Sequence, residues 1–143
     1  MSAEQALCFV DTNVLVYAFE KGGSSKKQTA QRLVTELMDT DRLRLSTQVL
    51  QELFVVLTRK AASRCTGDEA LAVLEDLAAW PVTLVDFPVI RDAAGLSGQA
   101  TLSFWDSLVL VSAAKSGASI LYTEDLNNGQ EILGVRVTNP FAA

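Results

Sequence analysis

Short apolar runs alternate with amphipathic stretches along the whole chain. The first run, Ala6–Val10 (ALCFV), is apolar at every position, which is typical of a strand covered on both faces in a parallel sheet. Four further runs predict short strands, at Leu43–Leu45, Val82–Val85, Ser119–Tyr122 and Val135–Val137. The stretches between them have helical character. This alternation predicts an α/β fold in which helices cover both faces of a mainly parallel sheet.

Several of the expected helices have clear start or stop signals. Thr66 and Glu69 form a T-x-x-E capping box, and Ser103 and Asp106 fit the pattern S-x-x-D before a very apolar segment that stops at Gly117. No Pro- or Gly-rich linker divides the chain, so residues 1–143 are expected to form a single domain. The predicted helices are Thr12–Phe19, Ser25–Met38, a segment from Ser46 or Thr47 to Lys60, Thr66–Ala79, a segment beginning near Pro88, and Ser103–Gly117.

The composition excludes several kinds of protein. The chain has no histidine, which excludes Ser-His-Asp and Cys-His catalytic units, a histidine general base and a histidine-ligated catalytic zinc. Its two cysteines cannot form a four-thiolate zinc site. The formal net charge of −5 excludes a uniformly basic nucleic-acid-binding protein.

The N-terminal sequence MSAEQALCFV has no basic start and only a short apolar run, so it does not resemble a signal peptide. No stretch approaches the roughly 20 apolar residues that a membrane helix needs. Cys8 lies in an apolar run and is expected to be buried. A disulfide between Cys8 and Cys65 would be expected in a secreted protein, and nothing in the sequence suggests secretion. We therefore expect a reduced, cytoplasmic enzyme or binding domain with no membrane segment.

Four acidic residues lie at positions that polar surroundings do not explain. Asp11 directly follows the first predicted strand, and Asp125 closely follows the strand Ser119–Tyr122, so both are expected at the carboxyl ends of strands, where such sheets bind ligands. Glu52 has valines at i−3, i+3 and i+4, which predicts that it lies on the apolar face of its helix. Asp106 lies in a helix that is apolar almost all round.

A divalent cation would explain these four acids together. Buried carboxylates are costly unless they are paired or bind a metal, and neighbouring ones raise each other's pKa. Hard oxygen ligands without histidine favour Mg²⁺ or Mn²⁺ over zinc. Such an ion activates water and stabilises a phosphodiester transition state without a protein base.

Each acid also has a purely structural interpretation. Asp106 is a partner for Ser103 in a helix cap, and Asp11 is a cap for the turn that follows it. Glu52 is a partner for Arg59 or for a neighbouring helix, and Asp125 is an ordinary turn residue. The four together are harder to explain in this way than any one alone.

At these residues the chain resembles the PIN-domain ribonucleases, and specifically the VapC-type toxins of bacterial toxin–antitoxin pairs. The matching segments occur in the family order and span essentially the whole chain. They are FVDTNVLVYAF with Asp11, STQVLQELFVVLTRK with Glu52, FWDSLVLVSAAKSG with Asp106, LYTEDLNNGQ with Asp125, and the ending GVRVTNPF.

The resemblance implies a three-layer α/β/α sandwich with a mainly parallel, about five-stranded sheet. It also implies Mg²⁺- or Mn²⁺-dependent cleavage of RNA by metal-activated water, a cognate antitoxin as partner, and a homodimer. Glu124 is the alternative to Asp125 as the fourth acid, and the T-x-D spacing favours Asp125. The residues that map onto the family's acidic ligands are Asp11, Glu52, Asp106 and Asp125, and those that match its supporting polar positions are Thr12, Asn13 and Thr123.

RNA binding has to be compatible with an acidic chain. Residues 21–64 carry nine basic and four acidic residues, a sum of +5, so the remainder carries −10. Three cations follow the Glu52 helix and are candidates for contact with RNA phosphates, namely Arg59, Lys60 and Arg64. The alternative is a solvated helix end, where cations also suit the helix dipole.

Rival functions fit the sequence less well. Haloacid-dehalogenase-like phosphatases need D-x-D, and here Asn13 occupies the second acidic position. A response-regulator receiver needs an acidic pair after the first strand, which offers only Asp11. The alternative from another class is a non-catalytic PIN-like domain that binds RNA or protein. For the antitoxin we expect a tail that anchors on apolar surface around residues 14–19 and 33–37 and directs a basic side chain to the acids.

Overall fold

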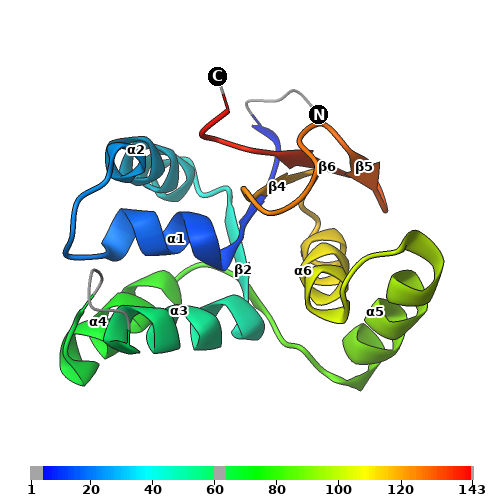
Figure 1. The fold of residues 1–143 in the computed structure, drawn as a ribbon, viewed down its shortest axis with the longest axis horizontal. Helices are drawn as coiled ribbons and strands as arrows, with labels where there is room; N and C mark the ends of the chain where they lie inside the picture. Colours follow the sequence, from blue (N-terminus) through cyan, green and yellow to red (C-terminus); the bar gives the residue numbers. More distant parts are fainter. Residues whose placement is uncertain (1–4, 60–63, 143) are drawn as a thin grey trace.

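The computed structural model describes residues 5–59 and 64–142, and within them helices lie on both sides of a single sheet (Figure 1). In Figure 1, α1 to α4 lie to one side of the sheet and α5 and α6 to the other, as the predicted α/β/α layering requires. The strands are β1 (Cys8–Val10), β2 (Leu43–Ser46), β3 (Val82–Thr83), β4 (Ile120–Tyr122), β5 (Glu131–Ile132) and β6 (Val135–Thr138). The helices are α1 (Thr12–Phe19), α2 (Ser25–Asp39), α3 (Thr47–Arg59), α4 (Gly67–Leu77), α5 (Phe87–Ala100) and α6 (Phe104–Lys115).

The first strand lies in the middle of the sheet, whose order is β3-β2-β1-β4-β6-β5. β1 pairs in parallel with β2 on one side and with β4 on the other, where Val10 lies opposite Tyr122. The chain thus builds the sheet outward from β1 in both directions. Open α/β sheets bind ligands at such a point, beyond the carboxyl ends of the strands.

The sheet has six strands where about five were expected. Five of them are parallel, and the additional one, β5, is a two-residue edge strand antiparallel to β6. Leu133 and Gly134 connect the two strands with positive φ angles of 56° and 76°, the conformation of a tight two-residue hairpin turn. A two-residue strand is too short to show a hydrophobic period, so the sequence gives no sign of it.

The capping interactions predicted at the starts of the helices are present in the structure. The Thr66 hydroxyl accepts the Glu69 amide at 3.1 Å, and the Glu69 carboxylate accepts the Thr66 amide at 2.9 Å, which completes the capping box. The Ser103 hydroxyl accepts the amide of Asp106 at 3.0 Å at the start of α6. Of the two residues considered for the cap of α3, Ser46 fills the role, because its hydroxyl accepts the Val49 amide at 3.3 Å.

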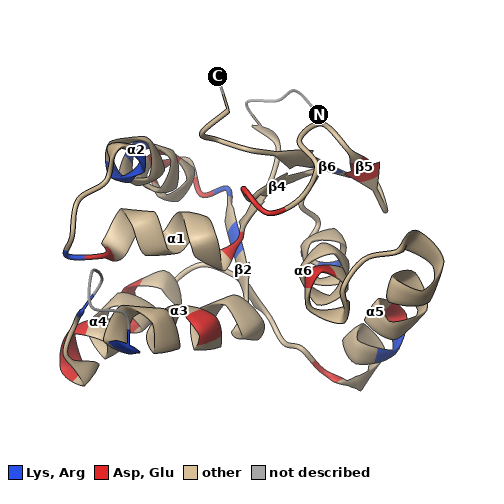
Figure 2. Cartoon of the chain, viewed as in Figure 1, with Lys and Arg blue, Asp and Glu red and all other residues tan. Residues whose placement is uncertain are grey.

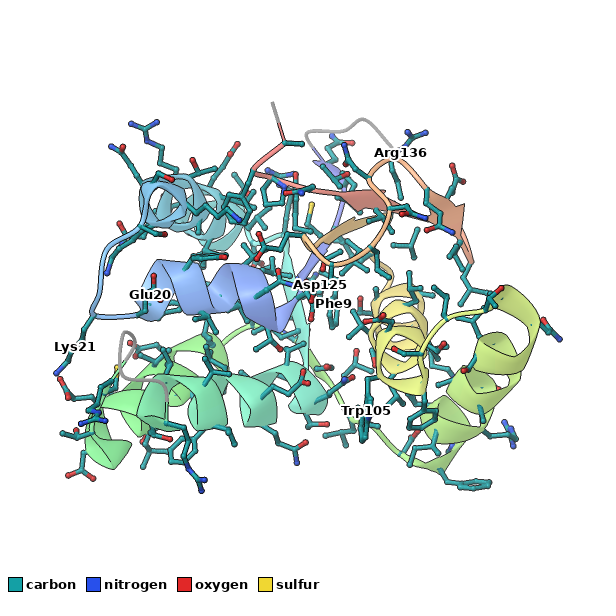
Figure 3. All side chains as sticks on the ribbon, in the orientation of Figure 1. Phe9, Glu20, Lys21, Trp105, Asp125 and Arg136 are labelled. Atoms are coloured by element: carbon teal, nitrogen blue, oxygen red, sulfur yellow. The ribbon has the colours of Figure 1, made fainter. Side chains whose placement is uncertain are left out.

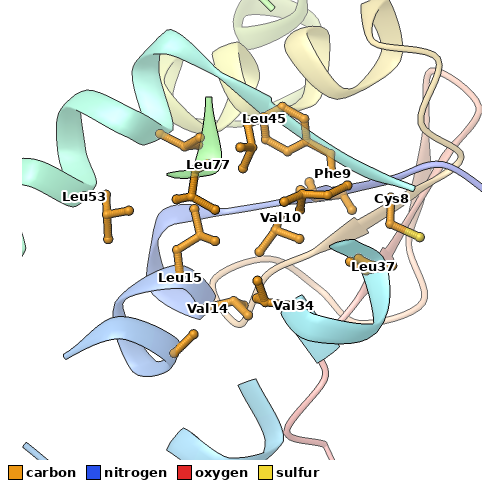
Figure 4. Packing of buried hydrophobic residues seen from close by; sticks show 14 of the residues in the cluster. Cys8, Phe9, Val10, Val14, Leu15, Val34, Leu37, Leu45, Leu53 and Leu77 are labelled. Atoms are coloured by element: carbon orange, nitrogen blue, oxygen red, sulfur yellow. The ribbon is translucent and has the colours of Figure 1, made fainter. Parts of the chain in front are cut away.

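The core lies around β1 and the helices packed on it (Figure 4). Phe9, Val10, Leu15, Leu45 and Leu53 are fully buried there. The expected apolar anchor for a partner at residues 14–19 and 33–37 is only partly available, because five of its side chains belong to the core. Val16, Tyr17, Phe19 and Leu33 are half-buried, and for them the anchor stays a prediction. The side chains in these two segments that belong to the core are Val14, Leu15, Ala18, Val34 and Leu37.

Both cysteines are buried, and neither forms a disulfide in the described part of the chain, as the absence of secretory signals suggested. Among the helices of the described residues, none is long and apolar enough to cross a membrane.

Candidate active site

Asp11 lies at the centre of the site, one residue beyond β1. It is buried, with 7% of its surface exposed, and its extended backbone makes it the N-cap of α1. Its Oδ1 atom accepts the Thr12 amide at 2.7 Å, and its Oδ2 atom accepts the Thr123 hydroxyl at 2.9 Å. The capping role proposed as an alternative is therefore real, but it uses one carboxylate oxygen only.

The loop after β4 supplies the next part of the site. Because Val10 and Tyr122 are in register, Asp11 and Thr123 leave the sheet side by side. Thr123 is fully buried, and its hydroxyl oxygen accepts the Asp125 amide at 3.2 Å. Figure 3 shows Asp125 near the middle of the molecule, between α1 and α6.

Asn13 links the two loops. Its side-chain amide donates to the Asp125 carboxylate at 2.9 Å and to the Thr123 hydroxyl at 3.1 Å. The same nitrogen lies 3.5 Å from Oδ2 of Asp11. A neutral amide between two carboxylates stabilises both negative charges without adding a third.

Glu52 reaches the site from α3. The Thr12 hydroxyl donates to its Oε1 atom at 2.9 Å, so Thr12 touches both Asp11, through its backbone, and Glu52, through its side chain. The prediction that Glu52 lies on the apolar face is wrong: Glu52 is exposed, and Val55 three residues on is 50% exposed. Of the three valines, only Val55 is exposed, whereas Val49 is fully buried in the core and Val56 is half-buried.

Asp106 lies half-buried in the first turn of α6. The bond from its amide to Ser103 uses only its backbone, so the cap and a role for the carboxylate are compatible. Gln48 in α3 donates to the carbonyl of Trp105 at 3.4 Å, which ties the first turn of α3 to that of α6. Glu52 lies one turn further along α3 than Gln48. Acidic positions on α3, α6 and the ends of β1 and β4 accordingly surround one edge of the sheet (Figure 2).

The electrostatics of Asp11 indicate a local excess of negative charge. Burial is the main cause that raises the pKa of this carboxyl group from 3.8 to about 6. The Thr12 amide and Thr123 hydroxyl lower it, while the charges of Glu52 and Asp125 raise it further. An ion of positive charge at this position would remove the cost of ionising Asp11.

The carboxylates of the site are suitable ligands for a hard cation, although their oxygen atoms are not arranged around one point. Across residues 5–59 and 64–142, no three or more acidic or cysteine side chains are arranged as a ready metal cage. The acids are instead connected through neutral side chains, with Asn13 between Asp11 and Asp125 and Thr12 beside Glu52. No hydrogen bond of the described residues joins the Asp106 carboxylate to this network. Carboxylate oxygens are nevertheless the ligands that Mg²⁺ and Mn²⁺ prefer.

Comparison with known proteins agrees with this arrangement. The family model described as "PIN domain" matches residues 8–128, which include every acid of the site. The chain belongs to the PIN-domain family. No curated protein sequence matches it.

Solved structures share the fold of this PIN domain at low sequence identity. A toxin–antitoxin complex from Klebsiella pneumoniae is 16% identical with a TM-score of 0.70, over 95% of this chain and 99% of that one. VapC20 of Mycobacterium tuberculosis, described as a sarcin–ricin loop cleaving toxin, is 22% identical with a TM-score of 0.66, over 82% and 89%. VapBC from Salmonella typhimurium, bound to DNA, is 20% identical with a TM-score of 0.64, over 94% and 98%.

Glu124 has other partners in this PIN domain. Its carboxylate accepts the Lys26 ammonium at 2.6 Å and the Tyr17 hydroxyl at 2.9 Å. Burial and the hydrogen bond to Glu124 raise the pKa of Tyr17. No local motif in the sequence indicates Tyr17 and Lys26 as partners of Glu124, because 107 and 98 residues separate them from it.

The predicted RNA-contacting cations lie at the far end of α3. Arg59 is exposed in the last turn, seven residues and therefore about 10 Å beyond Glu52 along the helix axis. Arg64 is exposed before α4, and Lys60 lies outside the described residues. Contact between these cations and RNA stays a prediction.

Proposed function

We propose that this PIN domain is a Mg²⁺- or Mn²⁺-dependent endoribonuclease that acts as the toxin of a toxin–antitoxin pair. The observation that carries the proposal is the buried Asp11 carboxylate at the middle of the sheet, with Glu52 and Asp125 close enough to raise its pKa. Membership of the PIN family supports nuclease activity. The likeness to a toxin that cleaves the sarcin–ricin loop supports RNA as the substrate.

In this proposal the metal ligands are Asp11, Glu52, Asp106 and Asp125. Thr12, Asn13 and Thr123 hold these carboxylates through the hydrogen bonds described above. The bound ion would supply activated water and stabilise the charge on the scissile phosphate. Asp125 is preferred to Glu124 as the fourth acid because it shares Asn13 with Asp11.

The test is RNA cleavage by the purified chain in EDTA, Mg²⁺, Mn²⁺ and Ca²⁺. We expect no cleavage in EDTA, restoration by Mg²⁺ or Mn²⁺, and poor turnover with Ca²⁺, whose looser coordination positions water less strictly. An Asp11→Asn preparation purified in parallel controls for contaminating ribonucleases.

Two results would contradict the proposal. Undiminished cleavage in EDTA would exclude metal dependence. RNA binding without cleavage under any metal would favour the alternative, a non-catalytic PIN-like domain that binds RNA or protein.

The proposed toxin requires an antitoxin. The cluster of Asp11, Glu52 and Asp125 favours inhibition by a basic side chain that enters the site and replaces the metal with charge-assisted hydrogen bonds. Replacing that basic residue by Ala should weaken inhibition more than binding, because most of the contact area lies elsewhere. Inhibition that does not respond to added Mg²⁺ would indicate that the antitoxin blocks RNA access instead.

We further propose that the domain works as a homodimer in the cytoplasm, where its RNA substrate is found. Three large apolar side chains at least 64% exposed, Leu84, Phe87 and Trp105, supply surface suited to self-association. Light scattering coupled to size exclusion should give twice the chain mass of 15.4 kDa.

A further inference from the structure

A second polar cluster lies behind the Asp125 loop and joins four distant parts of the chain. Lys26 of α2 and Tyr17 of α1 both contact the Glu124 carboxylate, and Phe141 comes from the C-terminal tail. Tyr17 and Phe141 pack edge to face with ring centroids 5.2 Å apart. The Lys26 ammonium lies 5.2 Å from one ring centroid and 5.3 Å from the other.

We propose that Lys26, Tyr17 and Phe141 form a clamp that holds Glu124 and thereby positions Asp125 for metal binding. The proposal rests on the proposed function, since Asp125 is a ligand only if the site binds a cation. It makes Glu124 a positioning residue, and it makes the metal affinity of the site depend on α2 and on the tail.

The clamp has a short mechanical path to the site. Glu124 lies between Thr123 and Asp125, and its amide donates to the side-chain oxygen of Asn13 at 3.4 Å. Asn13 also holds the Asp125 carboxylate, so Glu124 is fixed on its backbone side and on its carboxylate side. With both ends fixed, the peptide that leads into Asp125 has little freedom to rotate.

The aromatic rings make the ion pair stronger than one in open water. The Glu124 side chain is 20% exposed and that of Lys26 is 41% exposed. Partial exclusion of water strengthens a charge pair, and an ammonium over aromatic rings is attracted to their faces. The tail that supplies Phe141 is itself fastened, because the Asn139 amide donates to the Asn128 side chain at 2.8 Å.

The clamp also keeps a surplus carboxylate out of the site. Without Lys26 and Tyr17, Glu124 would lose both of its side-chain donors while remaining next to Asp125. An unpaired Glu124 carboxylate would then repel the neighbouring Asp125 carboxylate and shift it from its position in the site. The clamp thus explains how a chain with Glu in this position keeps a single ligand on the loop.

The direction in which Lys26→Met changes the metal affinity distinguishes a positioning role of Lys26 from a purely electrostatic one. Lys26→Met removes a positive charge near a cation site, and charge alone would therefore make Mg²⁺ or Mn²⁺ bind more tightly. If Lys26 positions the loop, its loss should make the ion bind more weakly. Tyr17→Phe removes only the hydroxyl donor to Glu124 and changes no charge, so it tests positioning without that complication.

The ion pair of Lys21 and Glu69 is a matched control. Its nitrogen–oxygen distance is also 2.6 Å, and it joins the segment after α1 to α4 rather than to the Asp125 loop. Lys21→Met removes the same charge and the same kind of contact. It should leave the metal affinity unchanged.

The experiment measures Mn²⁺ binding to the full chain by electron paramagnetic resonance, with thermal unfolding in EDTA to verify that each variant folds. We expect Lys26→Met and Tyr17→Phe to weaken Mn²⁺ binding by up to roughly tenfold, the lower end of what losing a direct hydrogen-bond partner of a metal ligand costs, because both residues act on Asp125 through Glu124. Lys26→Arg should retain most of the affinity. RNA cleavage should then reach half its maximum at a correspondingly higher Mg²⁺ concentration.

Three results of the Mn²⁺-binding experiment would overturn the clamp. Equal or tighter Mn²⁺ binding in both variants, with wild-type binding and RNA cleavage intact, would overturn the clamp and leave the proposed function standing. A wild-type chain that binds neither Mn²⁺ nor Mg²⁺ would overturn both. Weaker binding in Lys21→Met as well would show a general loss of stability and would also overturn the clamp.

Discussion

Asn13 and Asp125 are 112 residues apart in the chain, yet the side-chain amide of Asn13 donates to the Asp125 carboxylate at 2.9 Å. The same amide contacts the Thr123 hydroxyl and lies beside Asp11. This neutral side chain therefore acts together with the Thr123–Asp11 hydrogen bond to hold the loops that follow β1 and β4 side by side. Its position between the two carboxylates also offsets the repulsion between Asp11 and Asp125.

Replacing Asn13 with Ala should lower RNA cleavage by about 10- to 100-fold, since the Asp125 carboxylate loses the donor that orients it. The loss should appear mainly as a higher Mg²⁺ requirement. Asn127→Ala, at an exposed asparagine of the same loop, is the control. Equal activity in the two variants would show that Asn13 is not part of the site.

The stability of the metal-free chain should depend on pH through Asp11. Its pKa rises from 3.8 to about 6 on folding, so the folded chain binds this proton more tightly than the unfolded chain does. The free energy of unfolding should therefore fall as pH rises from about 4 to about 6 and then level off, by on the order of 3 kcal/mol.

Urea unfolding in EDTA at several pH values should reveal this by comparison with Asp11→Asn. Other titrating groups are the same in both proteins and cancel in the difference. Between pH 4 and 6, the free energy of unfolding of Asp11→Asn should rise relative to that of the wild type. Added Mg²⁺ at pH 7 should stabilise only the wild type. A difference that does not vary with pH would contradict the burial cost assigned to Asp11.

Asp106→Asn should reduce cleavage by orders of magnitude while the fold survives. The Ser103 cap uses the Asp106 amide, which the substitution retains, so α6 still begins normally. Asp68→Asn is the matched control, because Asp68 also lies in the first turn of a helix and loses the same charge. Activity near that of the wild type would mean that Asp106 serves only the helix start.

Thr66→Ala should destabilise the fold by about 1 kcal/mol without affecting cleavage. The substitution removes the hydroxyl that accepts the Glu69 amide and leaves the start of α4 without its side-chain cap. Chemical denaturation measures the change. A cost close to zero would show that the capping box contributes little in this chain.

Local patterns were sufficient to predict most of the elements. The apolar run at Cys8–Val10, the capping box at Thr66 and the Ser103 cap each rest on interactions within a few residues, and all three are present. β5 was missed because its two residues are a strand only by virtue of pairing with β6. The burial of Glu52 was predicted wrongly because helical spacing identifies a face but not what covers it.

The amino-acid sequence alone determined the chemistry available to this protein: acids at the ends of strands, no histidine, and a helix-and-strand order that brings strand ends to one edge. The folded chain determined which side chains meet. Asn13 contacts Asp125, and Glu124 turns to Tyr17 and Lys26, across separations of about a hundred residues. Local patterns cannot specify such contacts, because they depend on which strands become neighbours, and that follows from packing of the whole core.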